Sequence, residues 1–119
     1  MRIRVEDVFD AATALPGHER CAGLHGHTYK VEAVVQGQPT DGVVADFRLV
    51  RASLRQVLKR FDHADLSALY AYPSCEVLAL DIAAGLAKAV PGLELLRLWE
   101  GEGKWVEVDF QDLKEGAHA

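Results

Sequence analysis

Apolar and polar residues alternate over the first third of the chain, which is the pattern of half-buried β-strands. The first such segment opens with Ile3 and Val5 between charged neighbours and extends to about Thr13. The second, residues 25–37, alternates a tyrosine and smaller apolar residues with lysine, glutamate and glutamine. Because successive side chains of a strand point to opposite faces, we expect one buried and one polar face on each strand.

Two later segments change to the 3.6-residue periodicity of amphipathic helices. The first helix is predicted to begin after Asp46, which serves as its N-cap. Its apolar stripe consists of Phe47, Val50, Leu54, Val57, Leu58 and Phe61. The second helix is predicted from Ser74 to about Val90, where Pro91 and Gly92 stop it.

Two more strands are expected over residues 93–100 and 104–110, joined as a hairpin by the turn at residues 101–103. The polar tail, residues 111–119, is expected to fray. The order ββααββ predicts an α+β fold in which two helices cover one face of an antiparallel sheet. Because such a sheet leaves its edges and its second face uncovered, we also expect the protein to form an oligomer.

Length and composition set limits on the class of protein. The 119 residues are expected to form a single domain, residues 1–119, and the net charge of −5 argues against nucleic acid or an anionic membrane as the main partner. No apolar run approaches the roughly 20 residues that a membrane span needs. The N-terminus lacks the apolar core of a signal peptide, so a cytoplasmic location is the expectation.

The run from Cys21 to His27 carries the sharpest chemical signal. His25 and His27 stand two residues apart in a predicted strand, so their imidazoles share one face, as two ligands of one metal ion must. Cys21, on the preceding connection, offers a thiol that can act as nucleophile or as acid/base. Zinc normally takes three or four protein ligands, so other parts of the chain must complete a metal site.

Other candidates have two interpretations each. The adjacent Asp62 and His63 fit general acid–base chemistry or a plain surface loop. Glu100 extends the apolar face at the end of its strand, where its carboxylate reaches either solvent or the N–H groups of a ligand. Glu76 lies in the first turn of a helix, where acidic residues are favoured by the helix dipole alone. Cys75 is expected to pack as a small apolar residue rather than to form a disulfide with Cys21, because a reducing compartment keeps both as thiols.

Taken together, these segments resemble the family of 6-pyruvoyl-tetrahydropterin and 6-carboxytetrahydropterin synthases. The matching motifs, in order, are Phe9-Asp10-Ala11-Ala12, Cys21-x-x-x-His25-Gly-His27, Gly42-Val43-Val44-Ala45-Asp46-Phe47, Phe61-Asp62-His63-Ala64-Asp65-Leu66 and Pro73-Ser74-Cys75-Glu76. Trp99-Glu100 falls where the family ends a strand with a pterin-binding glutamate. The three-residue gap between Cys21 and His25 looks more like the bacterial queuosine-pathway branch than the animal biopterin branch.

The resemblance implies the tunnelling fold, in which the sheets of ββααββ subunits join around a ring, usually as a hexamer of two trimers with active sites between subunits. It also implies a zinc-assisted reaction on 7,8-dihydroneopterin triphosphate. The implied site residues are Cys21, Asp62 and His63 for catalysis, Ser74, Glu76 and Glu100 for the pterin, and His25 and His27 for zinc.

One departure from the family pattern affects the metal site. Thr13 stands where the family has its third zinc histidine, and a neutral hydroxyl is a poor zinc ligand. His18 could reach in from its loop as a substitute. Three hypotheses therefore remain: an active zinc lyase, a pterin-binding protein without tight zinc that runs an altered reaction such as aldol cleavage, and a non-catalytic oligomeric protein.

Overall fold

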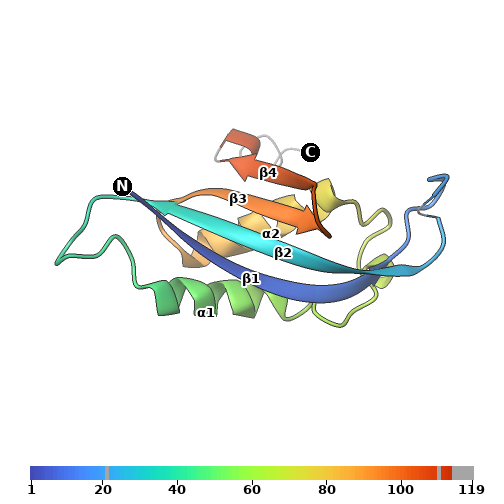
Figure 1. Ribbon diagram of the computed structural model, residues 1–119, viewed down its shortest axis with the longest axis horizontal. Coiled ribbons are helices and arrows are strands. Elements are labelled where there is room, and N and C mark those ends of the chain that lie inside the picture. Colours follow the sequence, from blue (N-terminus) through green and yellow to red (C-terminus); the bar gives the residue numbers. More distant parts are fainter. Residues whose placement is uncertain (21, 110, 114–119) are drawn as a thin grey trace.

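The computed structural model describes residues 1–20, 22–109 and 111–113. Its elements, in chain order, are β1 (Arg2–Thr13), β2 (His25–Gln36), α1 (Phe47–Leu58), the short 3₁₀ helix η1 (Leu66–Ala68), α2 (Cys75–Ala89), β3 (Leu93–Glu100) and β4 (Trp105–Asp109) (Figure 1). The predicted ββααββ order is thus confirmed, with η1 as an addition between the two helices.

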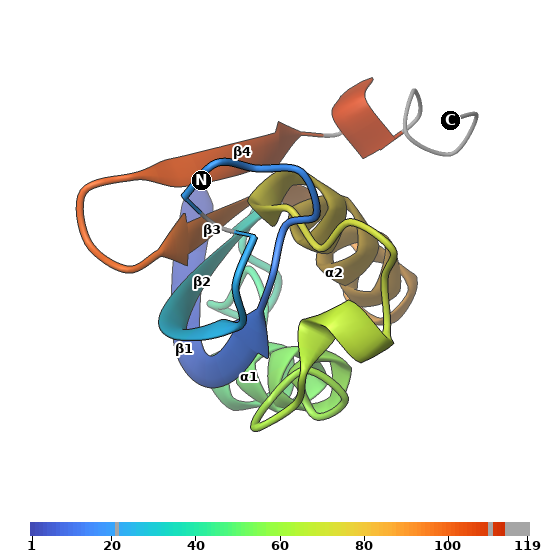
Figure 2. The same cartoon turned by 90° about the vertical axis from the view of Figure 1, so that its right-hand side faces the viewer.

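The strands form one antiparallel sheet in the order β1-β2-β3-β4. Both long helices lie on the same face of this sheet, and α1 packs against β1 while α2 packs against β3 and β4 (Figure 2). The opposite face carries no helix in the part of the chain that the structure describes. No helix of the described residues is long and apolar enough to cross a membrane.

The core fills the space between the sheet and the helices. At its centre the rings of Phe9 on β1 and Tyr29 on β2 stack with centroids 4.8 Å apart, and both side chains are fully buried. Of the predicted stripe on α1, Val50, Leu54 and Leu58 are buried, as is Phe61 just beyond the helix.

Phe47 departs from the prediction for the first helix. It belongs to the predicted stripe but is 60% exposed, so its place in the core is a correction. The reason is that Val44 and Ala45, on the loop before α1, pack against the core at that end of the helix.

Gly92 sets the return of the chain from α2 into the sheet. Its φ of +83° favours glycine, and a Cβ there would lie 2.8 Å from the carbonyl oxygen of Gln36 at the end of β2. The backbone N–H of Gln36 donates to the Gly92 carbonyl over 2.9 Å. The Pro91-Gly92 pair that was predicted to stop the helix therefore also fixes the start of β3 beside β2.

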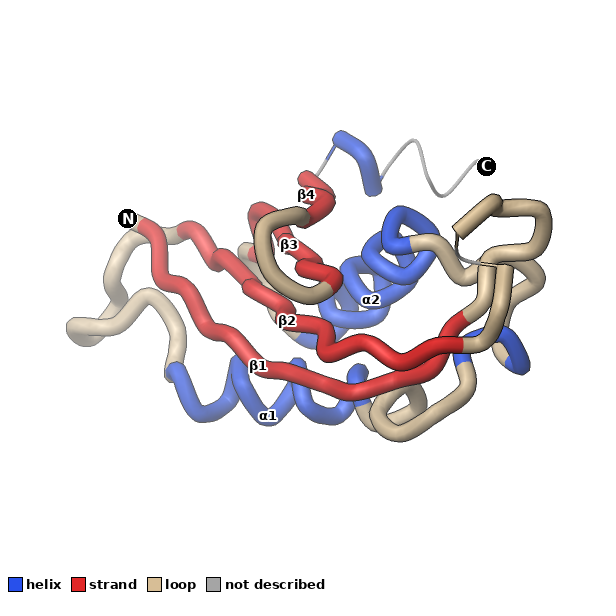
Figure 3. Tube along the Cα trace, turned by 45° about the vertical axis from the view of Figure 1, so that its right-hand side comes forward, coloured by secondary structure: helices blue, strands red, loops and turns tan. Residues whose placement is uncertain are grey.

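The strands differ in length, and this difference creates the site. β1 and β2 each have 12 residues, whereas β3 has eight and β4 five. Tyr29 pairs with Glu100, the last residue of β3, so the β1–β2 ribbon continues past β3 on its own (Figure 3). His25, His27 and Thr13 lie on this extension.

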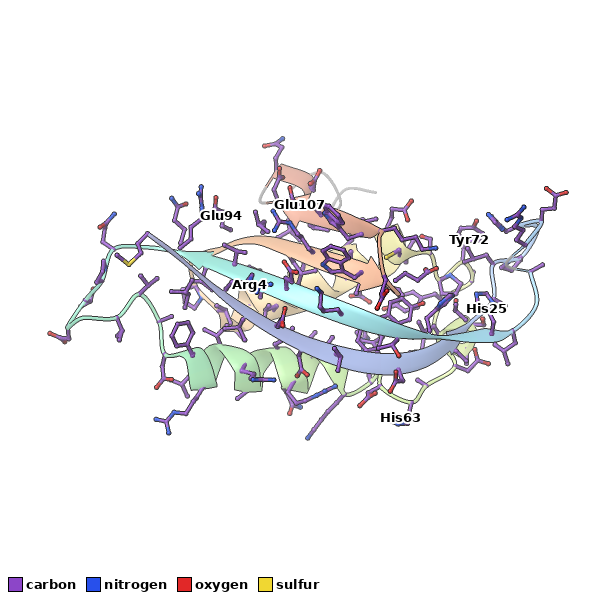
Figure 4. All side chains as sticks on the ribbon, in the orientation of Figure 1. Arg4, His25, His63, Tyr72, Glu94 and Glu107 are labelled. Carbon is purple, nitrogen blue, oxygen red and sulfur yellow. The ribbon has the colours of Figure 1, made fainter. Side chains whose placement is uncertain are left out.

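The helix-free face of the sheet contains a buried carboxylate. Glu32 on β2 is only 5% exposed and lies 3.1 Å from Arg4, 3.4 Å from Lys30 and 3.6 Å from Arg97. Burial raises the pKa of Glu32, but these three cations outweigh it and hold the pKa below its usual value. The cluster therefore ties three strands together through one ionised side chain. Arg4 is labelled in Figure 4.

We expect Glu32→Gln to lower the free energy of unfolding by about 1–3 kcal/mol at neutral pH, because three cations lose their shared counter-ion. Glu6→Gln, which removes a half-exposed partner of Arg4 at 3.0 Å, is the matched control and should cost below about 1 kcal/mol. Urea unfolding monitored by circular dichroism measures both variants.

The effect of Glu32→Gln should also depend on pH. A carboxyl with a lowered pKa stabilises the fold above its unfolded pKa of about 4.3, and this contribution disappears as the pH falls through the folded pKa. The difference between wild type and variant should therefore shrink below about pH 4. Equal decreases in the free energy of unfolding in Glu32→Gln and Glu6→Gln would show that the buried cluster does not stabilise the sheet.

Candidate functional site

The pairing of β1 with β2 decides which side chains meet at the end of the sheet. Thr13 pairs with His25 and Ala11 pairs with His27. The side chains of Thr13, His25 and His27 therefore point to the same face as Tyr29 and Glu100, the face that carries the helices. The structure thus brings the two predicted imidazoles beside the predicted pterin-binding glutamate.

The two imidazoles are in contact with each other. Their ring centroids lie 4.6 Å apart with the planes nearly perpendicular, at 87°. Nδ1 of His25 lies 2.7 Å from the carbonyl oxygen of Gly23. Because a carbonyl only accepts, this contact assigns the proton of a neutral His25 to Nδ1 and leaves Nε2 with a free lone pair.

The His27 side chain is largely buried, with 24% of it exposed. Its Nε2 lies 3.4 Å from Oε1 of Glu100, yet the atom is buried and has no aligned hydrogen bond among the described residues. Burial lowers the pKa of His27, and His25 and Lys104 add to this against the opposing effect of Glu100. The lowered pKa favours the neutral form of the His27 imidazole, which can accept a proton or bind a metal ion.

Thr13 occupies the third position of the predicted metal site. It is only 2% exposed, and its hydroxyl lies 3.5 Å from the carbonyl oxygen of Pro73. Among residues 1–20, 22–109 and 111–113, no group of three His, Cys, Asp or Glu side chains is placed to hold a metal ion. His18 accordingly does not complete a site with His25 and His27 there. These residues do not supply the three ligands that zinc requires.

The predicted pterin-binding residues share one pocket. Ser74, Glu76 and Glu100 line a cavity of about 370 Å³ together with His18, Tyr72 and Lys104. Ser74 is also the N-cap of α2, where its hydroxyl accepts from the backbone N–H of Val77 over 3.2 Å. The first turn of α2 therefore presents both side chains at the open end of β3. Tyr72 and His25 are labelled near this end of the molecule in Figure 4.

Cys75 lines the same pocket but is poorly suited to act as a nucleophile. Its Sγ lies 3.6 Å from the carbonyl oxygen of Leu98. Burial, followed by the negative charges of Glu100 and Glu76, raises the pKa of the thiol to about 12. The other thiol of the chain, the predicted catalytic Cys21, lies outside the described residues, as does any disulfide that would involve it.

Lys104 is a charged residue of the pocket that the sequence analysis missed. Its Nζ lies 3.4 Å from Oε1 of Glu100, the same oxygen that faces His27. The signal that could have found it is the hairpin itself. Trp99 pairs with Trp105, so Glu100 at the end of β3 and Lys104 just before β4 come next toward the turn and share a side.

The Asp62–His63 couple lies elsewhere on the subunit. Nδ1 of His63 lies 3.0 Å from Oδ1 of Asp62. Both residues are hydrogen-bonded to β1. The backbone N–H of Asp10 donates to the Asp62 carboxylate over 3.1 Å, and the backbone N–H of His63 donates to the Asp10 carbonyl over 2.6 Å. The Asp10 N–H, aided by His63 and Arg55, holds the pKa of Asp62 below its usual value despite some burial.

The couple does not face the pocket of Glu100 within one chain. The His63 side chain is 80% exposed and points away from the molecule past β1 (Figure 4). His63 lines a second, open pocket of about 550 Å³ that also includes Asp10, Thr28 and His27. His63 and His27 therefore line one open pocket of the same chain, whereas the residues that line the cavity of Glu100 include neither Asp62 nor His63.

The chain is similar in sequence to proteins of one known family. The family model described as 6-pyruvoyl tetrahydropterin synthase matches residues 2–111. A protein of Archaeoglobus fulgidus with the provisional name 6-carboxy-5,6,7,8-tetrahydropterin synthase is 34% identical over 109 residues, which are 91% of this chain and 95% of that protein. The dihydroneopterin monophosphate aldolase of Pyrococcus furiosus is 38% identical over 112 residues, which cover 92% and 97% of the two chains.

Solved structures show the same fold. The 6-pyruvoyl tetrahydropterin synthase of Caenorhabditis elegans superposes with a TM-score of 0.82 at 20% identity and covers 92% of this chain and 94% of its own. That of Plasmodium falciparum gives 0.75 at 17% identity, with 91% and 96% covered. These likenesses confirm the α+β tunnelling fold predicted for the subunit.

We expect Thr13→His to raise the affinity for zinc by about tenfold or more, because a third imidazole would then project beside His25 on the same face. Thr28→His is the matched control. Thr28 lies on the opposite face, where its hydroxyl donates to Asp10 over 2.5 Å. Titration calorimetry with zinc measures both variants, and circular dichroism verifies the fold. Equal affinities in the two variants would show that a third imidazole is not what the site lacks.

Proposed function

Because the chain belongs to the 6-pyruvoyl tetrahydropterin synthase family, we propose that it is a lyase that breaks a bond in the C6 side chain of a dihydroneopterin phosphate. Within this class we infer aldol cleavage of dihydroneopterin monophosphate, carried out by acid–base groups of the protein. The observation that carries this choice is Thr13, buried beside His25 where a third metal-binding imidazole would stand. The aldolase of Pyrococcus furiosus, similar over 92% of this chain, supports it.

The proposed reaction needs a base, an acid and a place for an electron pair. The base takes the proton of the 2′ hydroxyl, the C1′–C2′ bond breaks, and its electron pair moves into the N5=C6 imine of the pterin ring. Glycolaldehyde phosphate leaves, and protonation of C1′ gives 6-hydroxymethyl-7,8-dihydropterin. Since the substrate itself accepts the electron pair, the protein has only to bind the substrate, orient it and transfer protons.

Glu100 is the proposed anchor of the pterin. A carboxylate accepts two hydrogen bonds side by side, which matches the 2-amino group and the N3–H of a pterin. Glu100 lies at the end of β3 in the cavity of about 370 Å³, with Ser74 and Glu76 of α2 beside it. The ring would therefore lie in this cavity, with its recognition edge toward β3.

The histidine pair is proposed to act at the reacting side chain of the substrate. Glu100 is opposite Tyr29, and His27 and His25 follow at two-residue steps along β2. Nε2 of His27 lies 3.4 Å from Oε1 of Glu100, and the two imidazole centroids lie 4.6 Å apart. His27, whose pKa is lowered mainly by burial, is the proposed base, with His25 next to it.

Asp62 and His63 are proposed to act in the site of a neighbouring subunit. Within one chain the couple points outward past β1, an edge strand. A ring of subunits, with the hexamer of two trimers as the expected form, would bring it to another subunit's pocket. Cys21, on the connection that leads into His25, is proposed as the group that exchanges a proton at C1′.

A second candidate is 6-carboxytetrahydropterin synthase activity on 7,8-dihydroneopterin triphosphate, the reaction of the queuosine branch. The complete motif Cys21-x-x-x-His25-Gly-His27 and the Archaeoglobus fulgidus relative favour it. It depends on zinc held by His25 and His27, for which the described residues supply no third ligand.

Product analysis separates the two candidates. We expect the purified protein, treated with EDTA, to convert 7,8-dihydroneopterin monophosphate to 6-hydroxymethyl-7,8-dihydropterin, identified by liquid chromatography and mass spectrometry. A 6-carboxytetrahydropterin product formed from the triphosphate only with added zinc would establish the second candidate instead. No product from either substrate, with or without zinc, would leave a non-catalytic protein.

We expect Glu100→Gln to weaken the binding of 6-hydroxymethylpterin by about 10- to 100-fold, because the neutral amide replaces a charged acceptor of two N–H groups. The melting temperature should change little, since Glu100 lies at a strand end. Glu102→Gln, an exposed change in the neighbouring turn, is the control and should bind like wild type. Similar affinities for Glu100→Gln and Glu102→Gln would remove Glu100 from the proposed site.

A further inference from the structure

Lys104 occupies an unusual place for a surface lysine. It follows the turn in which Gly101 and Gly103 adopt positive φ values of 66° and 81°. This turn brings Lys104 back beside Glu100, with Nζ 3.4 Å from Oε1, and both side chains line the cavity of about 370 Å³. The ammonium group therefore stands next to the carboxylate that is proposed to bind the pterin.

The fold has little need of this ion pair. The Lys104 side chain is 69% exposed, and exposed pairs of this spacing contribute little to stability. The position is therefore suited to ligand recognition, because the side chain can turn from Glu100 to a bound molecule without disturbing the sheet. Its replacement should also leave the protein folded, so a change in affinity of a Lys104 variant can be attributed to ligand binding.

The recognition edge of a pterin has three polar groups in a row. The 2-amino group and N3–H are donors, and the 4-oxo oxygen beside them is an acceptor. When Glu100 accepts from the two donors, the neighbouring oxygen requires a donor of its own. The ammonium of Lys104 is the donor beside Glu100, and an ammonium has three N–H groups, so it can face both the carboxylate and the oxygen.

We propose that Lys104 is the specificity residue of this site, which binds the 4-oxo group and thereby selects 2-amino-4-oxopteridines over 2,4-diaminopteridines. This inference rests on the proposed function, because it takes Glu100 as the pterin anchor. In a 2,4-diaminopteridine N3 carries no hydrogen, so Glu100 also loses one of its two donors, and this loss is the same with or without Lys104. The 4-oxo oxygen is replaced by an amino group. Its N–H bonds would meet the N–H bonds of Lys104, so both donors would lose their water without gaining an acceptor.

The test measures the affinities of the full-length protein for 6-hydroxymethylpterin and for 2,4-diamino-6-hydroxymethylpteridine by titration calorimetry at neutral pH. Wild type should prefer the 4-oxo compound. Lys104→Met should bind this compound about tenfold more weakly, with no matching loss for the diamino compound. Lys104→Arg should restore part of the preference, since arginine keeps the charge and the donors. Lys88→Met, at the exposed last turn of α2, is the matched control and should leave both affinities unchanged.

The outcomes separate this inference from the proposed function. If wild type binds neither pteridine, both the proposed pterin site and the proposed role of Lys104 are refuted. If wild type binds 6-hydroxymethylpterin and Glu100→Gln weakens the binding, but Lys104→Met behaves like Lys88→Met, the pterin site stands and the role of Lys104 is refuted. A parallel loss of both pteridines in Lys104→Met would also refute selection at the 4-oxo group.

Discussion

The register between β1 and β2 pairs Phe9 with Tyr29 at the centre of the core and Thr13 with His25 at the end of the sheet. The stacked rings of Phe9 and Tyr29, both fully buried, belong to this pairing and hold it in one alignment. A slip by one residue would turn every side chain of a strand to the other face, and would expose this aromatic pair. The same alignment that buries the rings therefore puts the side chains of His25 and His27 on the face of the sheet that carries Glu100. A hydrophobic contact thus positions the polar site.

The difference in length between β1–β2 and β3–β4 determines where the site forms. Because β3 ends at Glu100 while β1 and β2 continue, the sheet leaves an open corner on its helix face. α2 begins at this corner, so its N-cap Ser74 and its first-turn Glu76 line the same cavity as Glu100. Ends of elements concentrate polar groups whose backbone partners are missing, and this explains why the candidate site lies here rather than along the strands.

The order of the elements and the face of the two histidines could be predicted from the sequence, whereas the exposure of Phe47 could not. Periodicity located the strands and both helices, and the two-residue spacing of His25 and His27 correctly placed their side chains on one face. Phe47 fitted the helical stripe but is exposed, because periodicity cannot tell that a preceding loop will fill the core at that end.

Positions in space between separate elements were harder to predict. The spacing of Asp62 and His63 gave no sign that the couple would lie outside the cavity of Glu100, since that depends on the turn after α1 and its hydrogen bonds to Asp10. The pair of Lys104 and Glu100 depends on the turn geometry of a hairpin whose existence was predicted but whose register was not. The role of Cys21 remains a prediction from the motif.

Thr13 connects the fold to the chemistry. A site with three imidazoles can polarise a substrate through a metal ion. In the present pair, the buried Nε2 of His27 lies 3.4 Å from Glu100, and the lowered pKa of His27 favours its neutral form. Neutral imidazoles serve as bases when nothing else occupies their lone pairs. Aldol cleavage of a dihydropterin side chain asks for such a base and supplies its own electron acceptor in the ring. We therefore interpret Thr13, at the position where the family resemblance implies a histidine, as a change in what the paired imidazoles do, on a fold that keeps the proposed pterin anchor Glu100.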